Sequence, residues 1–423
     1  MNQTTKLSNN IRVITRELKD RDSAAVGIWV GVGGRYEEDK NKGAAHFMEH
    51  MAFKGSQKYS CDEIKQLIEG VGGALNAFTS EEQTCYYSKV PVKFLPRAFD
   101  ILADMAFFPK IDPADMEKER AVILEEIKMY HDLPQYYVIE LLDGLLWPDH
   151  PLGKSLAGTA QSVGAMNRDD LKNFHQSFYV PGNIVVSGCG SLKHEVLVGL
   201  VQKKLAKIHG KKDRNYIKTT NGRLEPASRF YRKEIEQMHL AIGMRGYETN
   251  HKDLYVLAIL NIILGGNMSS RLFNEVREKH GLAYSISSSM KSLDDTGVFM
   301  IRAGVDNKKI VQAVELILKE LTKIRQNGVT PDEFKRAKDY FLGQFLLGLE
   351  DTLDHMLWIG EAIISNDKVH TLKDVVRKVK KVTPADVARV AEEILDQSRF
   401  KLSIVGPLND EQEKELQQYL IRA

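Results

Sequence analysis

The five-residue run HFMEH places two histidines and a glutamate where they could hold a metal ion and use it. The surrounding segment, Gly43–Gly55, is rich in alanine, methionine and phenylalanine, a pattern that predicts a helix. On a helix, His46 and His50 share one face, so both imidazoles can reach one ion. Neutral imidazole suits zinc, and Glu49 could accept a proton from water at the metal. The alternative is an amphipathic helix with two surface histidines.

A catalytic zinc site needs a third protein ligand, and the segment 115–130, part of a helical pattern that runs from Pro113 to Tyr130, offers glutamates for it. Glu119 and Glu126 are seven residues apart, two helical turns, and so share a face. Glu125 competes with Glu126 for the role, although it points about 100° away from Glu119. A charged helix face is commonly solvated surface. Here the Val122-Ile123 pair between the glutamates indicates a partly buried face instead.

The composition excludes several other classes of function. The chain has 423 residues, enough for two to four domains, and its 59 basic and 57 acidic residues give a net charge of +2. Such a balance argues against a general nucleic-acid or membrane-surface binder. No run of about 18 apolar residues occurs and the N-terminus lacks a signal-peptide pattern, so we expect a cytoplasmic protein. The three widely spaced cysteines predict free, buried thiols.

The sequence also contains an internal similarity. Residues 167–190 align with 383–406 at an offset of 216, both reading as a capped helix, a turn and an apolar strand that ends in glycine. Upstream, residues 112–127 align with 330–345 at an offset of 218. Two offsets this similar indicate two tandem copies of one fold.

The copies define the predicted domain organisation. We expect an N-terminal domain at 1–210, a basic and polar linker at 211–228, and a homologous C-terminal domain at 229–423. Strand patterns such as 23–33 are interspersed with long helical patterns such as 95–107. The fold class is therefore predicted as α+β, with a mainly antiparallel sheet flanked by helices in each domain.

The motif and its spacing resemble those of a known family. HxxEH followed by a glutamate 76 positions after its second histidine resembles the pitrilysin family of inverted-motif zinc peptidases. That family includes insulin-degrading enzyme and the mitochondrial processing peptidase. The length and the duplicated halves resemble its shorter branch, which contains the processing-peptidase β subunit and its bacterial relatives. The resemblance extends from Val13 to Gly406.

The resemblance implies a role for each residue of the motif. His46, His50 and Glu126 would be the ligands of one zinc ion per chain. Glu49 would be the general base, and Glu119 would support a ligand histidine from behind. No catalytic position departs from the family pattern, which counts against a degenerate, non-catalytic subunit.

A segment after the motif resembles the substrate-binding edge strand of the family. It reads GGALNAFTSEEQTCYY, and Asn76, Ala77 and Phe78 are the positions that match. The free N–H and C=O groups of an edge strand can pair with an extended peptide. The alternative is an ordinary sheet edge.

The second copy keeps the pattern of the fold without the metal ligands. Gln344 stands at the position of Glu126 shifted by 218, and residues 223–423 contain no paired histidines. Residues 265–289 instead resemble the second-domain signature of the family. By that resemblance Arg277 and Tyr284 bind the substrate carbonyl and act in catalysis by stabilising the oxyanion. Without the family, Arg277 reads as a solvated helix residue.

These expectations combine into one predicted function. We expect a zinc-dependent endopeptidase that cleaves peptides or unfolded segments, with its two domains arranged as a clamshell and two chains forming a homodimer. One alternative is a non-catalytic scaffold subunit without zinc. Another is a peptidase that is active only with a partner subunit. Neither nucleic acid nor a membrane is expected as a partner.

Overall fold

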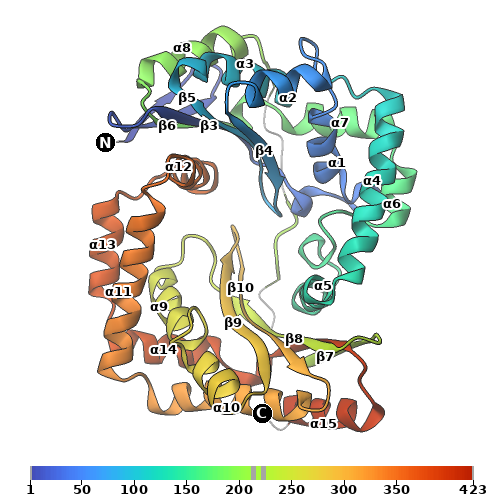
Figure 1. The fold of residues 1–423 in the computed structure, drawn as a ribbon, viewed down its shortest axis with the longest axis vertical. Coiled ribbons are helices and arrows are strands. Elements are labelled where there is room, and N and C mark those ends of the chain that lie inside the picture. The colour runs from blue at the N-terminus through green and yellow to red at the C-terminus, as the bar shows by residue number, and fades with distance from the viewer. Residues whose placement is uncertain (1, 211–215, 221–224, 422–423) are drawn as a thin grey trace. The chain divides into compact units, whose positions relative to one another are not determined.

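The computed structural model describes residues 2–210, 216–220 and 225–421, which form two compact units (Figure 1). Residues 211–215 and 221–224 of the predicted linker lie outside the described residues. Each unit is built mainly from one half of the chain and takes one segment from the other half. The first contains the described part of Met1–Ile127, Ser155–Ile217 and Leu346–Val369; the second contains the described part of Lys128–Lys154, Lys218–Phe345 and His370–Ala423. The division into domains at 1–210 and 229–423 stays a prediction.

The first unit is organised around a six-stranded sheet with the order β1-β2-β6-β3-β5-β4. Only β2 and β6 run parallel; the other neighbours are antiparallel. The strands are β1 (Asn2–Lys6), β2 (Arg12–Glu17), β3 (Ser23–Val30), β4 (Ala74–Thr79), β5 (Thr84–Pro91) and β6 (Ile184–Gly190).

Helices cover both faces of this sheet. The main core fills one face and includes residues of every other helix in this unit, whereas α12 packs on the other face. The helices are α1 (Ala44–Ala52), α2 (Cys61–Glu69), α3 (Leu95–Phe107), α4 (Pro113–Asp132), α6 (Ala160–Ala165), α7 (Arg168–Phe178), α8 (His194–Leu205) and α12 (Thr352–Asn366).

The central strand β3 shows why both faces need cover. Successive side chains on a strand point to opposite faces. Val26 and Ile28 enter the main core, while Ala25 and Trp29 enter the clusters beneath α12. A strand that is apolar on both faces requires helices on both, and the strand predicted at 23–33 accordingly forms through Val30.

Glycines let α12 approach the sheet closely. A Cβ atom on Gly360 of α12 would lie 2.1 Å from Nε1 of Trp29, and one on Gly27 of β3 would lie 2.7 Å from Sδ of Met356. Trp29 is fixed in turn, because its indole N–H donates to the Ser187 hydroxyl at 2.8 Å. The helix and the sheet therefore meet with no room for further side-chain atoms.

The second unit has a five-stranded sheet with the order β7-β11-β8-β10-β9. Only β7 and β11 run parallel. Helix α5 packs on one face against β8 and β11, where Gly243 leaves room for Leu142. The strands are β7 (Ala227–Arg232), β8 (Gln237–Gly246), β9 (Ala283–Ser292), β10 (Gly297–Asp306) and β11 (Lys401–Gly406).

The remaining helices complete the second unit. They are α5 (Pro134–Leu146), α9 (Leu254–Leu264), η6 (Phe273–Lys279), α10 (Ile310–Asn327), α11 (Pro331–Gly348), α13 (Leu372–Lys381), α14 (Pro384–Ile394) and α15 (Asp410–Ile421). The last turns of α4 and α11 extend across the boundary between the units. The prediction of an α+β fold with mainly antiparallel sheets flanked by helices is confirmed. Among the described residues, no helix combines the length and the apolar character that crossing a membrane requires.

Candidate metal centre

Helix α1 has one buried, apolar face and one partly exposed, polar face. The apolar residues of AAHFMEHMA are buried against the core, including Phe47 and Met51. His46, Glu49 and His50 are spaced three and four residues apart and remain partly exposed on the opposite face. The helix therefore presents two imidazoles and a carboxylate together.

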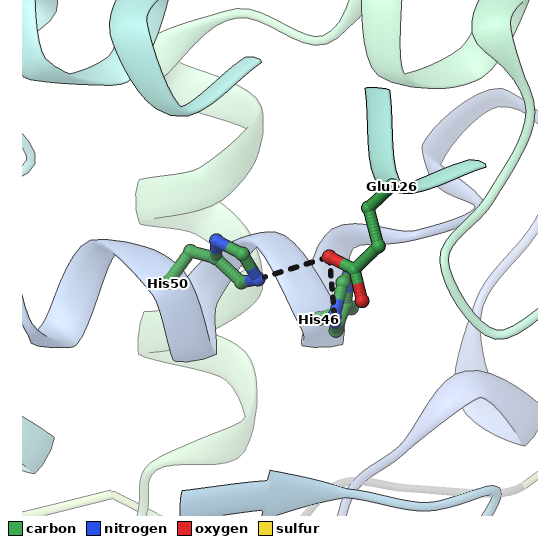
Figure 2. A group of neighbouring side chains, drawn as sticks. All are labelled: His46, His50 and Glu126. Atoms are coloured by element: carbon green, nitrogen blue, oxygen red, sulfur yellow. Dashed lines mark ion pairs between the residues drawn. The ribbon is translucent and has the colours of Figure 1, made fainter. Parts of the chain in front are cut away.

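Helix α4 brings Glu126 to these histidines. Figure 2 shows the three side chains converging from the two helices. The Oε2 atom of Glu126 lies 3.7 Å from His46 Nε2 and 3.5 Å from His50 Nε2. Two atoms bonded at about 2.1 Å to a tetrahedral zinc ion lie roughly 3.4 Å apart, so the group fits zinc. The described residues contain no second such group of His, Cys, Asp or Glu.

Behind the histidines lies Glu119, also on α4. Its Oε2 is 3.0 Å from Nδ1 of His50, and its Oε1 is 2.5 Å from the ammonium of Lys54. Glu119 is 5% exposed, and Ile123 beside it is fully buried, whereas Val122 points outward at 49%. A carboxylate that contacts the second nitrogen of a ligand histidine fixes the tautomer and orientation of its ring.

Burial and charge set the protonation of the site. Burial, helped by the neighbouring His50 and opposed by Glu126, lowers the pKa of His46 to about 4. Burial alone would lower the pKa of His50 as well, but the hydrogen bonds and charges of Glu126 and Glu119 outweigh it and raise that pKa. His46 is therefore neutral at neutral pH, the state in which an imidazole can bind a metal.

The candidate base, Glu49, contacts the edge strand. The hydroxyl of Thr79, the last residue of β4, donates to Glu49 Oε2 at 2.5 Å. Burial raises the pKa of Glu49, although the Thr79 hydrogen bond and His50 oppose the rise. A carboxyl group whose pKa is raised toward neutrality is better suited to accept and return a proton.

The three predicted substrate positions lie on β4, which is at one edge of its sheet. Ala77 is buried, in a strand that contacts α1, and its backbone N–H donates to the side-chain oxygen of Asn76 at 2.8 Å. Phe78 points to the other face and packs edge-on against Trp29 at 5.7 Å. Within the described residues β4 pairs with β5 alone. The strand thus has an open side next to the candidate metal site.

Arg277 and Tyr284 come together in the second unit. Arg277 lies in η6 and Tyr284 near the start of β9, with the guanidinium 5.8 Å from the centre of the Tyr284 ring. A second ring, Phe273, lies 4.7 Å from the same guanidinium. Tyr284 is highly exposed and the Arg277 side chain is 40% exposed, so both groups are available to a ligand. Their action at the metal site stays a prediction.

Comparison with known proteins places the chain in a family. The family model described as Insulinase (Peptidase family M16) matches residues 12–160, and that described as Peptidase M16 inactive domain matches 165–341. An uncharacterized zinc protease of Streptomyces coelicolor is 36% identical over 97% of this chain and 91% of its own length. The uncharacterized zinc protease YmxG of Bacillus subtilis is 34% identical over 94% of this chain and 97% of its own. The chain belongs to peptidase family M16.

Solved structures share the fold of this M16 chain. A protease from Helicobacter pylori has a TM-score of 0.90 at 22% identity, covering 96% of this chain and 99% of that one. A peptidase M16 inactive domain from Pseudomonas fluorescens also has a TM-score of 0.90, at 20% identity, covering 96% and 98%. At these identities the likeness shows the fold alone. The predicted resemblance to the pitrilysin peptidases is confirmed by the family and its relatives.

Two residues that contact the candidate site, Thr79 and Lys54, are not among those predicted from the sequence. Thr79 follows the predicted substrate positions directly, and its side chain shares a face with that of Ala77. Because side chains alternate between the two faces of a strand, Thr79 could have been predicted to face α1 once Ala77 was known to do so. Lys54, which neutralises Glu119, follows α1 without a distinctive pattern, so no sequence signal marked it.

Proposed function

We propose that this M16 chain is a zinc-dependent endopeptidase. The observation that carries the proposal is the convergence of two imidazoles and a carboxylate from α1 and α4, with a further carboxylate, Glu49, one turn away from the first histidine. Two relatives that are named zinc proteases support the proposal.

The proposed ligands are His46, His50 and Glu126, holding one zinc ion per chain. Three protein ligands leave a coordination position open, as catalytic zinc sites require. A bound zinc ion supplies a Lewis acid that polarises a carbonyl group and lowers the pKa of water. Glu119, with its charge balanced by Lys54, holds the His50 ring in the orientation for binding.

Glu49 is proposed to move the proton. Its carboxylate accepts a proton from the attacking water and returns it to the amine that leaves when the peptide bond breaks. The Thr79 hydroxyl holds one oxygen of that carboxylate, which leaves the other oxygen to the water. A group that acts first as base and then as acid benefits from a pKa nearer neutrality, the direction that burial gives Glu49.

The proposed substrate is a peptide or an unfolded segment of a protein. An extended chain can pair with the open side of β4 at Asn76, Ala77 and Phe78, whereas a folded protein does not offer a free strand there. Arg277 and Tyr284 are proposed to bind the substrate carbonyl and to stabilise the negative charge that develops on its oxygen.

The Glu49→Gln variant tests the mechanism. The amide keeps the shape of the side chain but cannot accept a proton, so hydrolysis of a quenched peptide should fall by about 10²–10⁴. Zinc content, measured by elemental analysis, should stay at one per chain because Glu49 is not a ligand. Cleavage at the wild-type rate would show that the assigned base is wrong.

Two measurements separate the proposal from its alternatives. A scaffold subunit predicts purified protein without zinc, and a partner-dependent peptidase predicts zinc without hydrolysis by the chain alone. The proposal predicts one zinc ion and cleavage by the chain alone, lost when a chelator is added. Size measurement in solution would test the expected homodimer.

A further inference from the structure

The first turn of α1 takes its cap from outside the helix. Its N-cap, Gly43, has no side chain to offer, and the turn contains no acidic residue. The first N–H groups of a helix lack partners within it. The carboxylate of Glu37 supplies acceptors for two N–H groups at this end of the helix. Its Oε1 accepts from the N–H of Ala45 at 2.7 Å and its Oε2 from that of Gly43 at 3.0 Å.

Glu37 is buried together with a single partner cation. Its Oε2 lies 3.2 Å from the ammonium of Lys42, and the two residues are 2% and 3% exposed. Lys42 also donates to the carbonyl of Gly34 at 2.8 Å. Burial raises the pKa of Glu37, and Lys42 is the largest influence opposing it. The charge on the cap therefore depends on Lys42.

The backbone around the pair has no room to shift. Gly43 has a φ of 95°, which favours glycine, and a Cβ there would lie 2.7 Å from the Ala157 carbonyl. A Cβ on Gly158 would lie 2.4 Å from the carbonyl of Lys42. That carbonyl also accepts the hydroxyl of Ser162 at 2.8 Å. The start of α1 is thus fixed from both sides.

We propose that the buried Glu37–Lys42 pair is a positioning device for the metal site, holding the turn of α1 that carries His46 in register with Glu126. His46 directly follows Ala45, whose N–H is held by Glu37. The His46 imidazole and the Glu126 carboxylate come from two different helices, α1 and α4 (Figure 2). A small displacement of the first turn of α1 would therefore move them apart. Glu37 touches no ligand side chain and acts only through α1. The inference rests on the proposed zinc site.

The test uses the full chain and the variants Glu37→Gln, Lys42→Met and the double variant. Glu37→Gln keeps one acceptor and removes the charge, while Lys42→Met leaves a carboxylate buried without its cation. We expect each single variant to weaken zinc binding by about 10–100-fold, measured by competition with a chelator. With cobalt in place of zinc, the visible absorption of each should differ from wild type. At saturating zinc, kcat should fall while KM stays within about twofold, because β4 is unchanged.

The double variant keeps the experiment decisive if a single variant fails to fold. Two uncharged side chains of similar volume avoid a buried, unpaired charge, so this variant should be the more stable one. It should still bind zinc more weakly than wild type. The matched control is Glu38→Gln with Lys40→Met, which removes an exposed ion pair of 3.0 Å from the same loop and should leave zinc affinity unchanged.

The outcomes separate the inference from the proposed function. Lower thermal stability in the folded variants, with wild-type zinc affinity and cobalt spectrum, would reduce the pair to a purely structural role and overturn the inference alone. A wild-type protein that binds no zinc would overturn the proposed function and the inference together. Weaker zinc binding in the double variant, and not in the control, would support the inference.

Discussion

The two units share the topology of a five-stranded sheet, to which β1 adds a sixth strand in the first unit, yet among the described residues only the first unit carries the candidate metal site. Strands β2-β6-β3-β5-β4 and β7-β11-β8-β10-β9 have corresponding orders, each with one parallel pair at the same place. In each unit a helix lies between the central strand and the edge strand in sequence: α1 in the first and α9 in the second. Helix α1 reads AAHFMEHMA, whereas α9 reads LYVLAILNIIL and is mostly buried. The same scaffold position therefore carries the candidate metal site in one unit and serves core packing in the other.

One contact between edge strand and helix occurs in both units. In the first, the hydroxyl of Thr79 donates to Glu49; in the second, the hydroxyl of Ser288 donates to the side-chain oxygen of Asn261 at 2.7 Å. An amide oxygen accepts such a bond as a carboxylate does, but it does not take up a proton at neutral pH. The contact is therefore common to both units, and only its acceptor in the first unit, Glu49, can take up a proton as the proposed mechanism requires.

Changing the proposed third ligand would make the first unit resemble the second. Glu126→Gln copies Gln344, the residue at the corresponding position. Losing a ligand carboxylate should weaken zinc binding by more than about 100-fold, beyond the effect of losing a supporting residue. Chelator competition would measure it, and peptide hydrolysis should fall in parallel.

The neighbouring Glu125→Gln provides the control for that substitution. Glu125 is not among the residues whose donor atoms converge at the candidate site, so its variant should keep wild-type affinity. If Glu125→Gln lost zinc and Glu126→Gln kept it, the ligand would have been assigned to the wrong glutamate.

The second unit is predicted to contribute to catalysis without binding metal. Arg277→Ala should lower kcat/KM for a peptide by about 100-fold, because a cation that stabilises charge in the transition state is lost. Zinc affinity should be unchanged. Lys279→Ala, which removes another cation from the end of η6, is the control and should keep full activity. Equal activity in the two variants would contradict the role assigned to Arg277.

Much of the fold could be predicted because its signals are local. Helix α3 forms at Leu95–Phe107 as its periodicity predicts, and α4 begins at Pro113, a residue that favours the first turn. On α1, spacing alone sets the relative directions of His46, Glu49 and His50. The approach of Glu126 to those histidines depends on how α1 packs against α4, which no local pattern specifies.

The exchange of helices between the units could not be predicted in this way. Helix α12 belongs to the second half of the sequence and covers the first sheet, while α5 belongs to the first half and covers the second sheet. An apolar helix face indicates burial and does not say against which sheet. The glycines that admit these helices, Gly27 and Gly243, read as ordinary strand glycines until the packing is known.

The edge-strand contact of the first unit can be tested by an isosteric change. Thr79→Val removes the hydroxyl that holds Glu49 and keeps the side-chain volume. We expect kcat to fall by about 10-fold, less than the roughly 10²–10⁴-fold that a general base contributes, because Glu49 itself is kept; KM and zinc affinity should change little. Thr79→Ser restores the hydroxyl and should recover most of the rate. A valine variant with wild-type kcat would show that Glu49 needs no such support.

The matching contact of the second unit should affect stability instead. Ser288→Ala removes the donor to Asn261 at a position that is 6% exposed, so the free energy of unfolding should fall by about 1 kcal/mol in urea titration. Zinc affinity should stay at the wild-type value. Ser285→Ala, on an exposed position of the same strand, should change stability by less than about 0.5 kcal/mol. If Ser288→Ala weakened zinc binding instead, the two contacts would not be independent, and the separation of packing from chemistry between the units would not hold.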